Sequence, residues 1–228
     1  MDLQNETAFA EVCRYLGYDA SRHQLTDRDR ALIWDGMEKI QLAAQPRTVL
    51  SPILPLTDAG QTLSVNARCA LCGRDIRAHL AHCSGAIFLA ATLGVQVDRL
   101  IRRAEVVDMA QAVILDAAAN VAIEQVCSEA EETLRTQLNA QGKYLTMRFS
   151  PGYGDFPIET QHTLLEMLDA PRKIGLSVTP THIMTPRKSV TAVMGVSDVF
   201  VKGRLAGCGS CVMRKTCIYR KRGTTCNG

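Results

Sequence analysis

Residues 106–138, "VVDMAQAVILDAAANVAIEQVCSEAEETLRTQL", contain the longest helical pattern in the chain. Small or apolar residues occupy nearly all of its middle part and therefore cover most of the helix circumference. Other elements must bury a helix of this kind, so we expect it at the centre of the fold. Its alanines would allow other backbone or a flat ligand to approach closely; they are Ala117, Ala118, Ala119 and Ala122.

The segments before this helix predict a mixture of helices and strands. Residues 6–16 and 26–44 have apolar positions at helical spacing, and glycine or proline follows each of them. Residues 46–56 are β-rich but contain prolines, which indicates an edge strand or an extended connector. Residues 73–83 resemble a short helix, and the apolar run 85–94 resembles a buried strand.

After the long helix, residues 160–168 predict a short helix and the β-branched residues of 189–197 predict a strand. The mixture of elements predicts an α+β protein. We expect three parts, namely a helical N-terminal extension (1–46), a central domain (47–200) and a basic cysteine-rich tail (201–228).

The composition excludes several classes of protein. With 228 residues, of which 46% are hydrophobic, the chain can bury a sizeable core. It has no apolar run near the roughly 18 residues that a membrane helix needs. Its first residues contain acids where a signal peptide would have a basic start, so we expect a cytoplasmic protein without a membrane partner.

The charge is distributed unevenly along the chain. The formal net charge is +3, yet residues 199–228 contain seven basic residues and no acidic one. The remainder therefore has an excess of acids, and the tail suggests an anionic partner such as nucleic acid. Only one aromatic residue, Tyr219, lies in the tail, which disfavours base stacking and nucleic-acid binding.

The segment "RFSPGYGDFPIET", residues 148–160, separates two predicted helices. Arg148 can donate two parallel hydrogen bonds to a carboxylate, Gly152 allows backbone groups to approach a ligand, and Tyr153 adds a ring with a hydroxyl. The segment lacks the spacing of a phosphate-binding loop. From composition alone, a structural turn and a binding site fit equally well.

Glu124 interrupts an apolar stretch of the long helix. Such a carboxylate is either a helix-surface residue or a buried acceptor for a cation or hydroxyl groups. The residues alone favour the surface position.

Six segments in this order resemble the reactivation domain of cobalamin-dependent methionine synthase, and more closely the short stand-alone proteins related to it. The segments are "RYLGY", "GRDIRAHLAHC", "FLAATLGVQVDRLIRR", "DMAQAVILDAAANVAIE", "RFSPGYGDFP" and "IMTPRKSVTAVMGVS". The resemblance implies a helmet-shaped α+β fold with a central antiparallel sheet and an extended groove that binds S-adenosylmethionine.

The resemblance also implies roles for individual residues. In that family the motif arginine holds the ligand carboxylate, which corresponds to Arg148. The following small residue, Ser150, would offer backbone hydrogen bonds, and Tyr153 would lie near the ligand together with Gly152. A helix of the family supplies a glutamate, which corresponds to Glu124. The large synthases place a further acidic ligand in an N-terminal segment rich in tryptophan and phenylalanine, and the sequence contains no such segment.

The function implied by the resemblance is reactivation of a corrinoid. Cobalamin oxidised to Co(II) is reduced again when methyl transfer from S-adenosylmethionine makes the reduction irreversible. We therefore expect a methyltransferase-type activity on a separate cobalamin-dependent methionine synthase or other corrinoid protein, with an electron donor such as flavodoxin or ferredoxin. Catalysis would rest on orientation and exclusion of water, without a catalytic acid or base.

The nine cysteines suggest metal or redox chemistry in a reducing compartment. Cys208, Cys211, Cys217 and Cys226 have a spacing that suits zinc or an iron-sulfur cluster, although free thiols on a basic tail are the alternative. This tail supports a second functional hypothesis, a redox or metal-carrying module on the same fold without methyl transfer.

A second cysteine and histidine cluster, "CALCGRDIRAHLAHC", resembles a zinc finger at first sight. Its gap between the second cysteine and the first histidine is too short for one, because a zinc finger needs about twelve residues there. The resemblance implies instead that residues 76–83 form a packed helix that leads into a strand.

Overall fold

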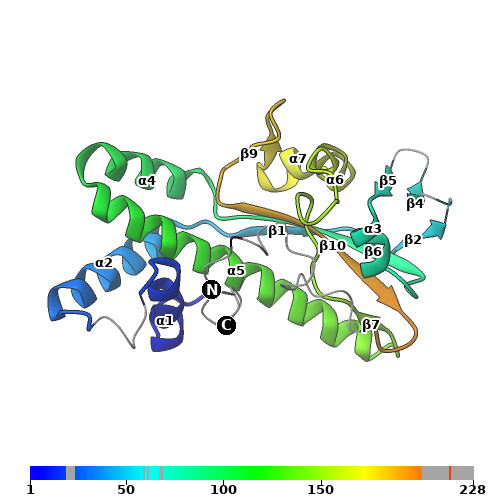
Figure 1. The fold of residues 1–228 in the computed structure, drawn as a ribbon, viewed down its shortest axis with the longest axis horizontal. Helices are drawn as coiled ribbons and strands as arrows, with labels where there is room; N and C mark the ends of the chain where they lie inside the picture. Colours follow the sequence, from blue (N-terminus) through cyan, green and yellow to red (C-terminus); the bar gives the residue numbers. More distant parts are fainter. Residues whose placement is uncertain (19–23, 59, 61, 67–68, 202–215, 217–228) are drawn as a thin grey trace. The chain divides into compact units, whose positions relative to one another are not determined.

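The structure is a computed structural model that describes residues 1–18, 24–58, 60, 62–66, 69–201 and 216 (Figure 1). Internal contacts group the chain into two units. Unit 1 comprises residues 1–49, 90–134 and 165–190, and unit 2 comprises residues 50–89, 135–164 and 191–228. The three-part division predicted from the sequence stays a prediction.

The first two helices of unit 1 form where the sequence predicts them. They are α1 (Glu6–Tyr15) and α2 (Asp27–Ala43). Thr26 caps α2 through a capping box with Asp29, in which each residue's side chain accepts a hydrogen bond from the other's backbone N–H. The rings of Phe9 and Trp34 stack with centroids 4.8 Å apart and join the two helices.

Two helices occupy this region, α4 (Val95–Val107), which ends within the first residues of the predicted long helix, and α5 (Met109–Asn139), which forms the rest of it. The predicted uninterrupted helix from residue 106 is wrong at Asp108, whose carboxylate accepts hydrogen bonds from the N–H groups of Ala110 and Gln111 at 3.0 and 3.1 Å. Such a cap starts a new helix. Figure 1 shows α5 as a long unbroken helix (green).

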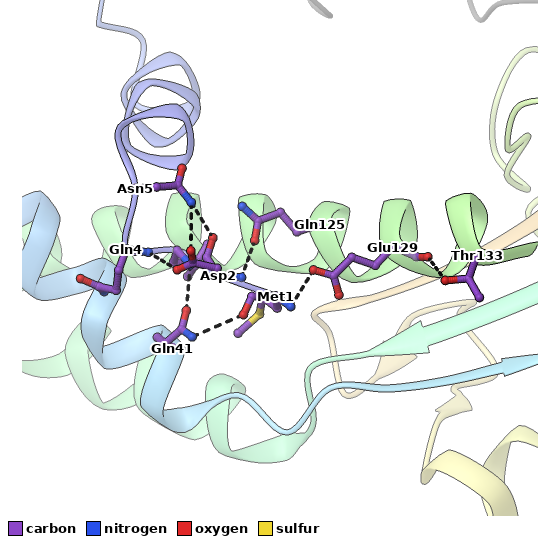
Figure 2. Close-up of polar contacts among 9 residues, drawn as sticks. Met1, Asp2, Gln4, Asn5, Gln41, Gln125, Glu129 and Thr133 are labelled. Atoms are coloured by element: carbon purple, nitrogen blue, oxygen red, sulfur yellow. Dashed lines mark hydrogen bonds and ion pairs between the residues drawn. The ribbon is translucent and has the colours of Figure 1, made fainter. Parts of the chain in front are cut away.

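Helix α2 and the N-terminal segment both contact α5. A Cβ atom on Gly36 would lie 2.5 Å from Ile114 Cγ2, so only glycine fits where α2 approaches α5. The N–H of Asp2 donates to Gln125 Oε1 at 3.1 Å, and Gln41 links the N-terminal segment to α2 (Figure 2). The N-terminal residues therefore lie beside the turn of α5 that contains Glu124.

The main sheet has the order β1-β6-β10-β7, and β2 also pairs with β6. The strands are β1 (Arg47–Leu50), β2 (Leu54–Pro55), β6 (Gly85–Thr92), β7 (Tyr144–Leu145) and β10 (Ser189–Ser197). The registers of β2 with β6 and of β10 with β7 are antiparallel. Every residue of β6 is buried, as its apolar run predicts.

Unit 2 also contains a small antiparallel sheet that the sequence analysis did not predict. Its strands are β3 (Thr57–Asp58), β4 (Thr62–Asn66) and β5 (Cys69–Cys72), in that order. Helix α3 (Arg74–His79) follows, and α6 (Thr160–Leu168) begins where the sequence predicts it. Short elements complete unit 1, namely α7 (Ala170–Ile174), β8 (Ser177–Val178) and β9 (Met184–Thr185).

The predicted α+β class, with antiparallel strand pairs and one long helix, is confirmed. In the part of the chain that the structure describes, no helix is both long and apolar enough to cross a membrane.

Candidate functional site

Phe149 fixes the start of the loop that contains most of the predicted site residues. It forms an antiparallel bridge with Val193 of β10, with both N–H to carbonyl distances 2.9 Å. Its ring is buried, so the side chains before and after it, Arg148 and Ser150, leave extended backbone toward the opposite side. Both of these residues are half-buried. The bridge thus holds Arg148 and Ser150 in place without using their side chains.

A tight turn follows the bridge. The N–H of Tyr153 donates to the carbonyl of Ser150 at 3.2 Å, and the N–H of Gly152 donates to the carbonyl of Phe156 at 2.8 Å. Gly152 has a φ of +91°, which L side chains rarely adopt. The side chain of Tyr153 is 55% exposed and leans toward Phe149, with ring centroids 6.3 Å apart. The turn therefore presents a tyrosine ring at the surface.

Asp155 attaches this turn to α3, a role that the sequence analysis missed. Its two carboxylate oxygens accept hydrogen bonds from the N–H groups of Arg74 and Asp75, each at 2.9 Å. The hydrogen bonds from the backbone of Asp75 and Arg74 lower the pKa of this carboxyl. The backbone of Asp155 also packs closely against Gly73, where an added Cβ would lie 2.8 Å from the Asp155 carbonyl oxygen. The partners are 80 and 81 residues apart in sequence, so no local pattern indicates this contact.

His79, at the end of α3, anchors the chain just before the loop. It is fully buried, and its Nε2 lies 2.8 Å from the Met147 carbonyl oxygen and 2.9 Å from Thr146 Oγ1. A carbonyl can only accept, so we assign the proton to Nε2. The Thr146 hydroxyl in turn accepts a hydrogen bond from the N–H of Gly195 at 2.8 Å. His79 therefore has a structural role, because it joins the end of α3 to residues 146 and 147, and this agrees with the helix expected at this position.

Glu124 lies on α5 in unit 1, and its side chain is exposed. The role toward a ligand that the resemblance implies for Glu124 stays a prediction. At helical spacing Glu124 shares one face of α5 with Asn120, Asp116 and Val113. The residues farther along this face line a cavity of about 250 Å³; the lining is Tyr15, Ile101, Glu105, Met109, Ala112, Val113, Asp116, Ala117 and Asn120.

Lys188 contacts the same face of α5 through Asp116 and Asn120, a role that the sequence analysis did not predict. Its Nζ lies 2.7 Å from Asp116 Oδ1 and 2.7 Å from Asn120 Oδ1. Only 13% of the lysine side chain is exposed. The loop before β10 is thus attached to α5 one turn before Glu124.

The structure gathers Arg148, Ser150, Gly152 and Tyr153 into one loop of unit 2, and it places Glu124 in unit 1. Their roles toward a ligand stay predictions. The four cysteines of the predicted metal site, Cys208, Cys211, Cys217 and Cys226, lie outside the described residues. Within the described ranges, no group of three or more metal-ligating side chains occurs.

Comparison with known proteins supports the resemblance seen in the sequence. Residues 92–200 match the family described as vitamin B12 dependent methionine synthase, activation domain. A solved structure described as the MetH reactivation domain bound to AdoHcy has a TM-score of 0.60 and 16% sequence identity, and the match covers 94% of this chain and 77% of that one. No curated protein matches the chain. The resemblance to the reactivation domain and the predicted fold class are confirmed.

Proposed function

We propose that this chain binds S-adenosylmethionine and supports the reductive methylation of cob(II)alamin on a separate corrinoid protein. The observation that supports this most directly is the Arg148–Tyr153 loop, whose backbone is fixed by the bridge of Phe149 and the cap of Asp155 and which contains an arginine, a glycine of positive φ and an exposed tyrosine ring. The solved relative with this fold was crystallised with S-adenosylhomocysteine, the demethylated product of the same ligand.

Arg148 is proposed to bind the carboxylate of the ligand. A guanidinium group donates two parallel hydrogen bonds to a carboxylate, and such a pair selects orientation as well as charge. The bridge at Phe149 holds the arginine backbone on β10, so little conformational freedom of the loop is lost on binding.

Ser150, Gly152 and Tyr153 are proposed to line the path of the ligand. Gly152 is proposed to let the backbone of the turn approach the ligand closely. The exposed Tyr153 ring offers a flat apolar surface and a hydroxyl group. Glu124 is proposed to accept hydrogen bonds from the ligand from its place on α5.

The reaction then depends on the position of the methyl group relative to cobalt and needs no acid or base catalyst. One electron reduces Co(II) to Co(I), which attacks the sulfonium methyl carbon. The carbon–sulfur bond breaks, and methylcobalamin and S-adenosylhomocysteine result. The donor of the electron is a separate reductant of the flavodoxin or ferredoxin class. The task of this chain is to hold the methyl group toward the corrinoid and to exclude water.

Calorimetric titration with S-adenosylmethionine tests the proposal. The wild-type chain should bind, and Arg148→Ala should weaken binding by about 10-fold or more, as expected for loss of a charge-assisted hydrogen bond. Arg172→Ala is the matched control, because the Arg172 side chain is 86% exposed and pairs with Asp169, the residue just before its helix α7. Unchanged binding by Arg148→Ala, or an equal loss in the control, would contradict the site assignment.

A methyl-transfer assay tests the second half of the proposal. Methylcobalamin should form on an added corrinoid protein in the presence of S-adenosylmethionine and a reductant. Binding of the ligand without methylcobalamin formation would limit the function to ligand binding.

A further inference from the structure

The cavity of about 250 Å³ in unit 1 lies between α4 and α5, two helices that follow one another in the chain (Figure 1). Ile101 and Glu105 line it from α4, where their spacing of four residues puts them on one helix face. The first turns of α5 line it from the other side, and Tyr15 lines it from the end of α1. The proposed function does not use this cavity.

The floor of the cavity is apolar, and its rim can be reached from solvent. Ile101, Ala112 and Ala117 are only 6%, 3% and 4% exposed and form the floor. Met109 and Val113 line the cavity as well, yet they are 62% and 52% exposed. Large apolar side chains around a hollow stay in contact with water until another apolar group covers them. The apolar body of a ligand can therefore enter from solvent and remove this surface from water.

The charged residues that line the cavity are both carboxylates. Asp116 is already paired, because its Oδ1 lies 2.7 Å from Lys188 Nζ. Lys188 also contacts the lining residue Asn120, at 2.7 Å from its Oδ1. Glu105 is exposed and has no hydrogen bond or ion pair among the residues that the structure describes. Glu105 is therefore the lining carboxylate that a bound cation can neutralise.

Tyr15 adds an aromatic wall that is 43% exposed. The guanidinium carbon of Arg14 lies 4.7 Å from the centroid of this ring. Glu11 compensates the charge of Arg14, because its Oε2 lies 2.9 Å from Arg14 Nη2. Arg14 thus leaves no uncompensated positive charge beside the ring that would repel a cation.

We propose that this cavity binds a small organic amine, a primary ammonium cation with a linear apolar body. The ammonium pairs with Glu105 at the exposed side, and the apolar body lies on Ile101 and Ala112. Ligand pockets for drug-sized molecules have volumes of roughly 300–1,000 Å³, so a cavity of about 250 Å³ takes a smaller ligand. An anion would meet carboxylates without a lining cation, which disfavours it. The inference does not rest on the proposed function, because none of the residues assigned to S-adenosylmethionine lines this cavity.

Calorimetric titration of the full chain with n-alkylammonium ions tests the inference. The affinity should rise by about 4-fold for each methylene group from butylammonium to hexylammonium, as expected for burial of a methylene group. Hexanol has the same body without the charge and should bind more weakly, and hexanoate should not bind. Equal affinities for butylammonium and hexylammonium would show that the apolar body stays in water and would overturn the inference.

Two pairs of variants locate the bound ion. Glu105→Gln should weaken hexylammonium binding by about 2- to 5-fold and leave hexanol binding unchanged, as expected for loss of an exposed charge pair. Glu38→Gln, at an exposed glutamate of α2, is its control and should bind like the wild type. Val113→Trp fills the exposed side of the cavity and should abolish binding of both ligands. Val107→Trp is its control, because Val107 is 80% exposed and does not line the cavity.

Each remaining outcome supports or overturns the inference. Equal losses in Glu105→Gln and Glu38→Gln, or full binding by Val113→Trp, would place the ammonium elsewhere. Arg148→Ala should bind hexylammonium like the wild type, and displacement of hexylammonium by S-adenosylmethionine would overturn the assignment of a separate site. A chain that binds S-adenosylmethionine but not hexylammonium would refute this inference and leave the proposed function intact.

Discussion

Replacement of Lys188 by methionine should destabilise the protein by about 2 kcal/mol. Lys188 Nζ makes two contacts of 2.7 Å, to Asp116 Oδ1 and Asn120 Oδ1, and a third of 3.3 Å to the Asp116 carbonyl oxygen. A hydrogen bond to a charged group contributes about 1.5–3 kcal/mol. The Asp116 side chain is 49% exposed and water can solvate it again, so we expect a net loss close to that of a single such bond.

Methionine preserves the length of the lysine stem, so the loss reports the polar contacts rather than packing. In thermal unfolding, about 2 kcal/mol corresponds to a decrease of about 4–8 °C in Tm for a chain of this size. Lys39→Met is the control, because Lys39 pairs with Asp35 at 2.6 Å on the surface of α2 and its side chain is 39% exposed. The control should change stability by less than about 0.5 kcal/mol. Equal effects of the two substitutions would refute the idea that Lys188 attaches the loop to α5.

Three other perturbations have defined outcomes. Gly195→Ala should lower the free energy of unfolding, measured in urea, by about 1–3 kcal/mol, because the new Cβ would overlap Cys83 Sγ and lie 2.9 Å from Leu80 Cδ2. An unchanged free energy of unfolding would contradict this steric argument. Asp155→Ala should speed hydrogen exchange at the N–H groups of Arg74 and Asp75, whereas unchanged protection would contradict the cap. Burial raises the pKa of Cys69 and of Cys83 from 9.0 to about 11. The folded state therefore favours the neutral thiols, and the stability that they contribute should be complete below pH 9 and lost as the pH rises to 11. A double Cys→Ala variant at these positions should show a smaller loss over that range, and an identical pH profile would exclude this cause.

The sequence predicts the regular elements of the fold well, because their signals are local. The capping residue Thr26 and the helical spacing after it predict α2, and the apolar run before Gly94 predicts β6. The break at Asp108 has a local signal too, since an aspartate can cap a new helix. The sequence analysis gave more weight to the continuous apolar pattern around Asp108 and missed it.

The contacts that organise the candidate site have no local signal. Asp155 caps a helix about 80 residues away, and Lys188 pairs with Asp116 across 72 residues. Neither distance can be read from spacing or composition. The strands β4 and β5 were missed for a different reason, because they are only five and four residues long: the sequence TLSVN of β4 does alternate polar and apolar residues, but over a very short run, and CALC of β5 does not alternate. The motif at residues 148–153 was found through the family resemblance, because its composition fits a structural turn and a binding site equally well.

The loop at residues 148–156 is attached to the rest of unit 2 at several points. Here the bridge of Phe149 and the cap by Asp155 attach the loop at both ends, and His79 holds the chain before it. These anchors fix the backbone on both sides of Arg148 and Tyr153, which supports the proposal that the loop binds a ligand, and loss of S-adenosylmethionine binding in Arg148→Ala is the result that would establish it.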